Sequence, residues 1–227
     1  MPKTDIWAVI PVKDTSKAKG RLANLVPKHL RPGLSLAMFE DVLDEISKTK
    51  DLSGIVVVTI DSAASSIAKQ YDARIFSDEP RGGHTAVIAA AARRLQNEGC
   101  EGMLQIPGDI PLITKNEVSL ILSNYQPAPS FAIVPSHDDR GSNAILVSPP
   151  CAVPLTFGEN SFVPHLSAAK KNNINPQVIR IPRIARDIDC AEDVRIFSSY
   201  QSATRTQAFL ECNGLGNGNP KGTKIKY

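Results

Sequence analysis

Three aspartates occupy positions where their carboxylates could bind a divalent cation. Asp109 follows the apolar run 103–106 within the segment PGDIP, and Asp187 and Asp189 lie two residues apart further along the chain. In an extended segment residues i and i+2 point to the same side, so Asp187 and Asp189 can present two carboxylates to one point. Mg²⁺ binds a few carboxylates and completes its shell with water and phosphate oxygens. We therefore predict a magnesium site at these aspartates, with helix capping as the alternative for Asp109 and Asp189.

A cluster of basic side chains follows the first apolar run of the chain. Lys13, Lys17, Lys19 and Arg21 lie within nine residues directly after the run 6–12. Such a loop is either solvated or binds an anion, and it lacks the phosphate-binding pattern GxxxxGK[ST]. Its place after a predicted strand favours phosphate binding.

A third candidate is the segment GENSFVPHL, which begins at Gly158 and places Ser161 before a predicted helix. Amides at a helix start bind phosphate or carboxylate, although Ser161 could equally be an ordinary N-cap. His84 and His165 have no metal-binding partner at helical spacing, and we interpret them as ordinary surface or pocket-lining histidines. Lysines, aspartates and an anion site at one sheet edge would suit transfer between two phosphorylated molecules.

Alternating strands and helices are expected to position these residues. Continuous apolar runs predict strands at 6–12, 55–60, 73–76, 103–106, 131–135, 144–147 and 178–181. Helical spacing and helix-forming residues predict helices at 34–46, 62–70, 84–96, 115–124 and 162–171, with a further one from about 191. This alternation predicts a three-layer α/β fold whose mixed sheet is mostly parallel, with ligands at the carboxyl ends of the strands.

Composition limits the function classes that fit the chain. It has 227 residues and a net charge of +3, but Lys221, Lys224 and Lys226 lie near its end, and the remainder has 23 basic and 23 acidic residues. A nucleic-acid binder normally carries a basic excess, so we do not expect that function. No run approaches the ~20 apolar residues of a membrane span, and the start does not resemble a signal peptide. We expect a cytoplasmic protein whose four scattered cysteines are reduced.

The periodic pattern fades near residue 201. We expect residues 1–200 to form a single nucleotidyltransferase domain and residues 201–227 to be a tail that is flexible or docked on a partner.

Several of these segments together resemble the guanylyltransferases of coenzyme F420 biosynthesis, in the nucleotide-diphospho-sugar transferase superfamily. The resemblance covers residues 6 to 197 and rests on five segments in order: IPVKDTSKAKGRL, GDIPLI, RGSNAIL, FGENSFVPHL and RDIDCAEDV. It implies a Rossmann-like fold. It also implies transfer of GMP from GTP to the phosphate of 2-phospho-L-lactate, phosphoenolpyruvate or 3-phospho-D-glycerate, with release of pyrophosphate.

The resemblance also implies roles for individual residues. Asp109, Asp187 and Asp189 would hold Mg²⁺, as two ions, and Asp109, Lys13 and Arg21 would be catalytic. The acceptor acid would be bound by Lys13, Asn143, Gly158 and Ser161. The nucleotide would be bound by Pro11, Lys19, Arg21, Gly83, Thr85 and Gly108. After Gly83 the family more often has a Leu-Asn pair, whereas this chain has His84-Thr85-Ala86.

Two alternatives fit the same residues. One is a related nucleotidyltransferase that acts on the molybdenum cofactor or on methylerythritol phosphate, but such enzymes usually open with a glycine-rich loop that IPVKDTSKAKGRL lacks. The other is a non-catalytic nucleotide-binding subunit, which would not need three metal-binding carboxylates. By analogy of fold we expect a homodimer, and we expect the product to pass to the next enzyme of the pathway.

Overall fold

The computed structural model describes residues 5–77 and 83–215. Within them the chain forms a seven-stranded sheet in the order β3-β2-β1-β4-β6-β5-β7. The strands are β1 (Ile6–Pro11), β2 (Gly54–Val58), β3 (Arg74–Phe76), β4 (Gly102–Gln105), β5 (Ser130–Pro135), β6 (Ser142–Ser148) and β7 (Gln177–Val178). β6 runs antiparallel to both of its neighbours, and the other strands all point the same way. The predicted fold class, an α/β fold with a mostly parallel mixed sheet, is confirmed.

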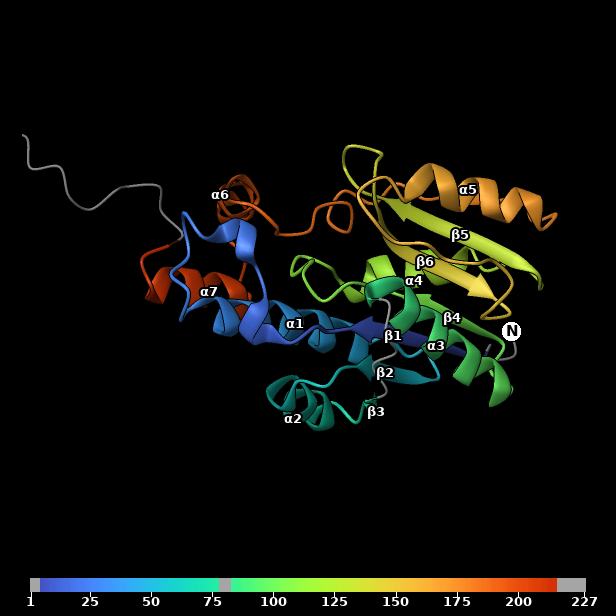
Figure 1. Cartoon of the computed structure of the whole chain (residues 1–227), viewed down its shortest axis with the longest axis horizontal. Helices are drawn as coiled ribbons and strands as arrows, with labels where there is room; N and C mark the ends of the chain where they lie inside the picture. The colour runs from blue at the N-terminus through green and yellow to red at the C-terminus, as the bar shows by residue number, and fades with distance from the viewer. Residues whose placement is uncertain (1–4, 78–82, 216–227) are drawn as a thin grey trace, which may run out of the picture.

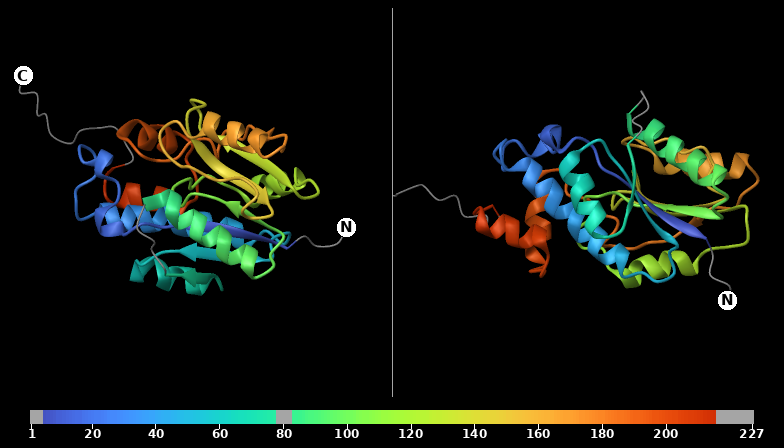
Figure 2. Two further views of the ribbon diagram at one scale, coloured as in Figure 1. Left: turned by 45° about the vertical axis from the view of Figure 1, so that its right-hand side comes forward. Right: turned by 90° about the horizontal axis from the view of Figure 1, so that it is seen from below.

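Helices cover both faces of this sheet (Figure 1). The helices are α1 (Arg31–Ser47), α2 (Ser62–Gln70), α3 (Gly83–Asn97), α4 (Lys115–Ser123), α5 (Phe162–Lys171), α6 (Ala191–Ser199) and α7 (Arg205–Cys212), and the first loop holds two 3₁₀ turns, η1 (Thr15–Lys17) and η2 (Gly20–Leu22). Apolar residues of α1, α2 and α4 form one core with the sheet, whereas those of α3 and α5 form a second core on the opposite face. Figure 2 shows these three layers from below.

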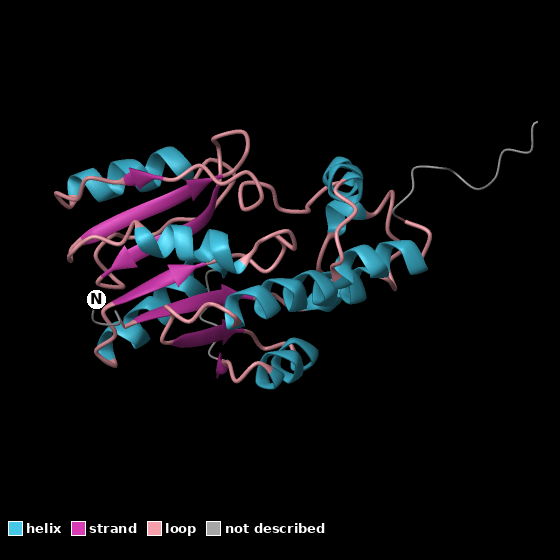
Figure 3. Cartoon of the chain, turned by 180° about the vertical axis from the view of Figure 1, so that it is seen from behind, coloured by secondary structure: helices cyan, strands magenta, loops and turns pink. Residues whose placement is uncertain are grey.

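A third, smaller core lies beyond the carboxyl ends of the strands. It joins Leu22 and Val26 of the lysine-rich loop to Leu34 of α1, Phe197 of α6 and Leu210 of α7. The amino-terminal half of α1 extends past the sheet toward α6 and α7, as Figure 3 shows from behind. The loop that carries the basic residues is therefore packed into the fold on its apolar side.

The expected tail differs from the structure in its first part. Residues 205–212 form α7, whose N-terminal amides at Arg205 and Thr206 donate to the buried carboxylate of Asp41 in α1, at 2.8 and 2.9 Å. α7 lies so close to α1 that a Cβ at Gly33 would stand 2.7 Å from the ring of Phe209. These contacts make α7 part of the folded body, which corrects the boundary at residue 200. Residues 216–227 lie outside the described residues.

The other elements follow the sequence pattern closely. The bounds of α2 and α5 agree with the prediction, and α1 begins three residues earlier than predicted, at Arg31. β7 consists of Gln177 and Val178 and is shorter than the strand predicted at 178–181. None of the helices in the described part of the chain is long and apolar enough to cross a membrane.

Candidate active site

Asp109, Asp187 and Asp189 converge at the carboxyl end of the sheet. One carboxylate oxygen from each residue lies within 4.8 Å of the others, and we call these residues the acidic triad. Asp109 follows β4, whereas Asp187 and Asp189 flank Ile188 in the segment before α6. The Ile188 amide donates to the Asp109 carbonyl at 3.0 Å, and the Ile188 side chain is buried in the third core. Ile188 thereby holds its two acidic neighbours beside Asp109, as their i, i+2 spacing predicts.

Neither Asp109 nor Asp189 caps a helix. α4 begins with a capping box in which Thr114 is the N-cap and Glu117 its partner. α6 begins after Cys190, and the Asp193 carboxylate accepts the amides of Asp189 and Cys190 at 3.1 and 2.9 Å. Helix capping is therefore wrong as an explanation of these two aspartates, and their side chains are available for a site.

Lys19 lies inside the acidic triad. Its Nζ is 2.7 Å from Asp109 Oδ2 and 2.7 Å from Asp189 Oδ1, and its side chain is only 9% exposed. Lys19 has a left-handed backbone with φ 55°, which is uncommon for a residue with a side chain. Burial would lower the pKa of Lys19, but the charges of Asp109 and Asp189 outweigh burial and raise that pKa. Lys19 is therefore a charged counter-ion of the triad.

The three carboxylates differ in how well they are compensated. Burial, followed by repulsion from Asp109 and Asp189, raises the pKa of Asp187 to about 6. Burial opposes ionisation of Asp189 too, but there Lys19 outweighs it and lowers the pKa. Asp187 accepts a hydrogen bond from Asn143 Nδ2 at 3.3 Å. Three converging carboxylates with one lysine between two of them form an oxygen-rich, under-compensated cluster, which fits a hard divalent cation.

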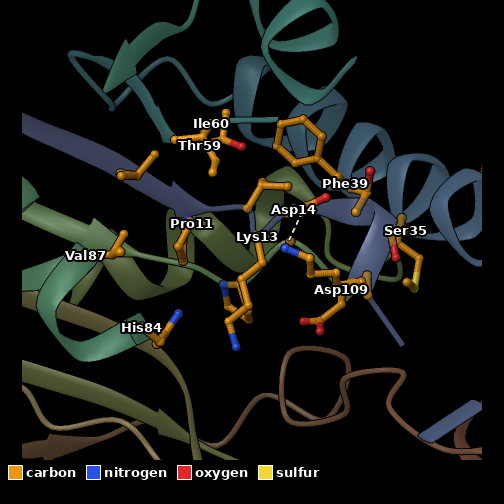
Figure 4. Close-up of a pocket in the computed structure, with 18 of the residues that line it drawn as sticks. Pro11, Lys13, Asp14, Ser35, Phe39, Thr59, Ile60, His84, Val87 and Asp109 are labelled. Atoms are coloured by element: carbon orange, nitrogen blue, oxygen red, sulfur yellow. Dashed lines mark ion pairs between the residues drawn. The ribbon is translucent and has the colours of Figure 1, made fainter. Parts of the chain in front are cut away.

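A pocket of about 570 Å³ opens beside the triad (Figure 4). It lies at the carboxyl ends of β1, β2, β3 and β4, with walls from α1 and α3 and with Met38, Phe39 and Val87 among its apolar lining. Lys13, Lys17 and Lys19 line it on the side of the first loop, and Asp109 and Asp189 reach its edge. An apolar cavity of this size with charged groups at one end suits a ligand that has a flat apolar part and an anionic part.

Most of the residues predicted to bind a nucleotide line this pocket. Pro11, Lys19, Gly83 and Gly108 are in its wall, as is the exposed Lys13. Thr85 is not, and its hydroxyl instead accepts the Phe157 amide at 3.0 Å. His84 takes the pocket position beside it, and burial, then the charge of Lys13, lowers the pKa of His84 to about 4.

Asp61 connects the lysine-rich loop to the fold. Asp61 Oδ2 accepts the amide and the hydroxyl of Thr15 at 2.9 and 2.6 Å, while Oδ1 caps α2 by accepting the amides of Ala63 and Ala64. The loop is thus anchored at the end of β2, next to the pocket. Asp61 is not among the predicted site residues, although an aspartate directly before the run SAAS is a helix-start signal.

Of the residues predicted to bind the acceptor, Lys13 lines the pocket, whereas Asn143, Gly158 and Ser161 do not, and we call the part of the site around these three the acceptor side. Asn143, near the start of β6, donates to the Ile184 carbonyl at 2.9 Å as well as to Asp187. Ser161 is 4% exposed and makes no side-chain cap of α5, and its hydroxyl donates to Ser142 Oγ at 3.1 Å. Gly158 is exposed, and a Cβ there would meet nothing within 4 Å. Asn143 therefore joins the acceptor side to the triad directly.

Arg21, predicted to be catalytic and to bind the nucleotide, is exposed at the rim of the site. Its guanidinium lies 2.9 Å from Glu159 in the loop before α5, and both side chains are about 70% exposed. This contact connects the lysine-rich loop to the acceptor side across the triad. An exposed ion pair of this kind contributes little stability, so Arg21 can exchange partners at small cost.

Comparison with known proteins places this site in a family. The sequence model of the family described as "Guanylyl transferase CofC like" matches residues 6–224. A 3-phospho-D-glycerate guanylyltransferase of Colwellia psychrerythraea is 34% identical over 194 residues, covering 86% of this chain and 91% of the relative. A phosphoenolpyruvate guanylyltransferase of Roseiflexus castenholzii is 34% identical over 203 residues, covering 89% and 92%. A 2-phospho-L-lactate guanylyltransferase of Methanobrevibacter smithii is 28% identical over 211 residues, covering 91% and 90%.

The fold has relatives among solved structures as well. A protein from Desulfovibrio desulfuricans G20 that is assigned to the nucleotide-diphospho-sugar transferases superimposes with a TM-score of 0.77, at 16% identity, covering 93% of this chain and 96% of that one. This similarity confirms the fold. The family match and the identity to the Colwellia and Roseiflexus proteins go further, and from them the chain belongs to the CofC-like guanylyl transferase family.

Proposed function

We propose that the protein transfers GMP from GTP to the phosphate of a small phosphorylated acid and releases pyrophosphate. The acid would be 2-phospho-L-lactate, phosphoenolpyruvate or 3-phospho-D-glycerate, which are the acids in the names of the relatives. The reaction would be a step in coenzyme F420 biosynthesis. The observation that carries the proposal is the acidic triad, with Lys19 paired to two of its carboxylates, between the pocket and Asn143.

The chemistry needs charge compensation more than it needs a base. An oxygen of the acceptor phosphate attacks the α-phosphorus of GTP, a new P–O bond forms, and the bond from the α-phosphorus to the bridging oxygen breaks as pyrophosphate leaves. The attacking phosphate is already ionised near neutral pH, so no side chain has to remove a proton. Two like charges 4 Å apart repel by about 4 kcal/mol at an effective dielectric constant near 20, and several such pairs meet here.

The residues present fit this task. The triad would hold Mg²⁺, proposed as two ions, which would neutralise phosphate charge and orient the reacting oxygens. Lys13, Lys17 and Lys19 line the pocket where the triphosphate would lie, and they would attract it. Met38, Phe39 and Val87 offer an apolar surface to the base. The site would therefore act by positioning and by stabilising charge.

A pyrophosphate-release assay tests the proposal. The protein is incubated with GTP, Mg²⁺ and each of the three acids in turn, with reactions lacking acid, or containing ATP or CTP in place of GTP, as controls. We expect pyrophosphate with GTP and at least one acid, and a competition among all three acids identifies the preferred one. Binding of GTP without pyrophosphate release would instead indicate a non-catalytic subunit. In parallel reactions with methylerythritol phosphate or a molybdenum cofactor precursor as the acceptor, turnover with one of these alone would indicate the related transferase.

The compartment, the oligomeric state and the partner in the pathway are also proposals. We propose that it acts in the cytoplasm as a homodimer and passes its product to the enzyme that follows in the pathway. Light scattering on the purified chain tests the dimer, and a molecular mass equal to one chain of 24.5 kDa would contradict it.

A further inference from the structure

His165 is a fully buried histidine beside the acceptor side of the site. It belongs to α5 and has no exposed surface. Its Nε2 lies 2.9 Å from the Thr156 amide nitrogen, and its Nδ1 lies 2.9 Å from Ser142 Oγ. The ring also packs edge-on against Phe157 at 5.2 Å. A buried imidazole with a partner at each nitrogen has a fixed orientation.

These partners fix the tautomer of His165. A backbone amide can only donate, so Nε2 must accept and carries no proton. The proton of the neutral ring is then on Nδ1, which donates to Ser142 Oγ. Burial lowers the pKa of His165 to about 4, so the ring is neutral near pH 7.

The hydroxyl proton of Ser142 has no hydrogen-bond acceptor among the described residues. The Ser142 oxygen has two lone pairs, and it accepts one hydrogen bond from His165 Nδ1 and one from the Ser161 hydroxyl at 3.1 Å. Both acceptor positions are thus filled, and the hydroxyl can interact further only as a donor. Among residues 5–77 and 83–215, Ser142 Oγ makes no hydrogen bond besides these two.

The position of Ser142 brings this donor to the acceptor side. Ser142 opens β6, which runs antiparallel to β4, so the start of β6 lies beside the end of β4 that leads to Asp109. The next residue, Asn143, donates to Asp187 at 3.3 Å. Ser142 is half-buried, whereas Ser161 is buried and directs its proton inward. Of the two serines, Ser142 is therefore the more exposed and the one whose proton is not committed to a partner.

We propose that the Ser142 hydroxyl donates a hydrogen bond to an anionic oxygen of the acceptor acid, and that His165 is the positioning residue that holds this hydroxyl as a donor. This proposal rests on the proposed function. It adds Ser142 as the hydrogen-bond donor to the acceptor acid and His165 as the residue that positions it. In it, Ser161 acts through Ser142 and does not donate to the acceptor through its own side chain. A hydroxyl limited to donation favours anions over neutral groups, because it has no lone pair left for a partner's proton.

Steady-state kinetics on Ser142→Ala test the proposal, with the acid that the wild-type protein turns over. A hydrogen bond to a charged group corresponds to about a 10- to 100-fold change, so we expect KM for the acid to rise by that factor while KM for GTP stays within about twofold. Ser167→Ala is the control, since Ser167 is an exposed serine on α5, the helix that carries His165. Melting temperatures show whether each variant is folded, and Ser142→Cys replaces Ser142→Ala if the latter does not fold.

Two substitutions of His165 separate positioning from packing. Asn places its amide near the position of Nδ1 and can still donate to Ser142, whereas Gln places its amide near the position of Nε2 and can satisfy only Thr156. We expect His165→Asn to keep KM for the acid closer to wild type than His165→Gln, even where both lower the melting temperature. A structural role alone would make KM follow the melting temperature.

The outcomes distinguish a failure of the proposed function from a failure of the inference about Ser142. If the wild-type protein releases no pyrophosphate with any of the three acids, the proposed function fails, and this inference fails with it. If the wild type is active and Ser142→Ala leaves KM for the acid unchanged, the inference alone is overturned. Ser161→Ala provides a further check: loss of acid binding in Ser161→Ala but not in Ser142→Ala would assign the donor to Ser161 and overturn the proposal for Ser142.

Discussion

The two sides of the acidic triad are built from different interactions. On the pocket side, Lys19 is bound between Asp109 and Asp189 by two ion pairs of 2.7 Å. On the acceptor side, Ser142, Ser161 and His165 are uncharged and are joined by hydrogen bonds of 2.9 and 3.1 Å. The first side is held together by opposite charges, and the second by hydrogen-bond donors that are matched to acceptors.

This difference indicates how each side should respond to change. Charges that compensate one another leave an unpaired charge when one is removed, and another cation can replace the missing one. In a hydrogen-bonded network each donor must face an acceptor. A substitution is therefore tolerated only if the new side chain keeps a donor or acceptor at the same place. The charged side should therefore respond most to metal ions, and the neutral side to protonation of His165 and to the geometry of side-chain amides.

The largest effect is expected from Asp109→Asn, which removes the charge of one triad carboxylate that forms an ion pair with Lys19. We expect the fold to persist and pyrophosphate release to fall on the order of 10³-fold, because stabilisation of charge at the reacting phosphates is lost. Circular dichroism and the pyrophosphate assay measure the two properties. Asp51→Asn, at an exposed loop position, is the control, and full turnover by Asp109→Asn would contradict the account.

Lys19→Met should show that the charged side depends on a counter-ion. Without metal, loss of Lys19 leaves Asp109 and Asp189 uncompensated, and we expect a loss of about 2–3 kcal/mol of stability, less than for a fully buried pair because their side chains are 29% and 45% exposed. Saturating Mg²⁺ should raise the melting temperature of Lys19→Met more than that of the wild type. Equal shifts in both proteins would mean that Lys19 does not stand in for a cation.

The neutral side should weaken in acid. The folded pKa of His165, about 4, lies below the unfolded value of 6.5, so the stability that its neutral ring contributes is present above pH 6.5 and is lost as pH falls toward 4. Between pH 7 and pH 5 we expect a loss of about 2 kcal/mol that His165→Asn does not show. Urea titrations of both proteins at the two pH values measure it, and parallel losses would contradict the prediction.

The smallest effect is expected from Asp61→Asn, which alters the attachment of the lysine-rich loop without altering the triad. The retained oxygen can still cap α2, whereas the new amide cannot accept from Thr15. We expect KM for GTP to rise by about fivefold, from a loss near 1 kcal/mol, with KM for the acid little changed. If both KM values rise equally, the loop does not serve the nucleotide side specifically.

The sequence predicts those features of the two sides of the triad that rest on local patterns. The i, i+2 spacing of Asp187 and Asp189 and the apolar run before Asp109 are enough to place three carboxylates at one sheet edge, and the structure brings them together. The bounds of α2 follow from its N-cap, Asp61, and from its helix-forming residues. The spacing of Asp187 and Asp189 and the cap of α2 involve neighbours in the chain, which a pattern records directly, whereas the meeting of Asp187 and Asp189 with Asp109 depends on the order of the strands in the sheet.

Features that join distant residues were not predictable in the same way. Lys19 contacts residues 90 and 170 positions away, so its burial in the triad cannot be read from the basic loop alone. The sequence does not distinguish His165 from an ordinary histidine, because its partners, Ser142 and Thr156, follow no helical spacing. α7 was missed because its polar sequence forms a helix with the help of Asp41, which lies 164 positions before Arg205.

Binding of Mn²⁺, a spectroscopic substitute for Mg²⁺, tests the central claim that the three carboxylates form one cation site. The measurement is a titration of Mn²⁺ followed by electron paramagnetic resonance, with GTP present, on the wild type and on Asp187→Asn. Asp187 is informative because it has no ion pair with Lys19 and accepts a hydrogen bond only from Asn143 among the described side chains. We predict stoichiometric binding by the wild type and binding at least about tenfold weaker in Asp187→Asn. Unchanged affinity in Asp187→Asn would contradict the account.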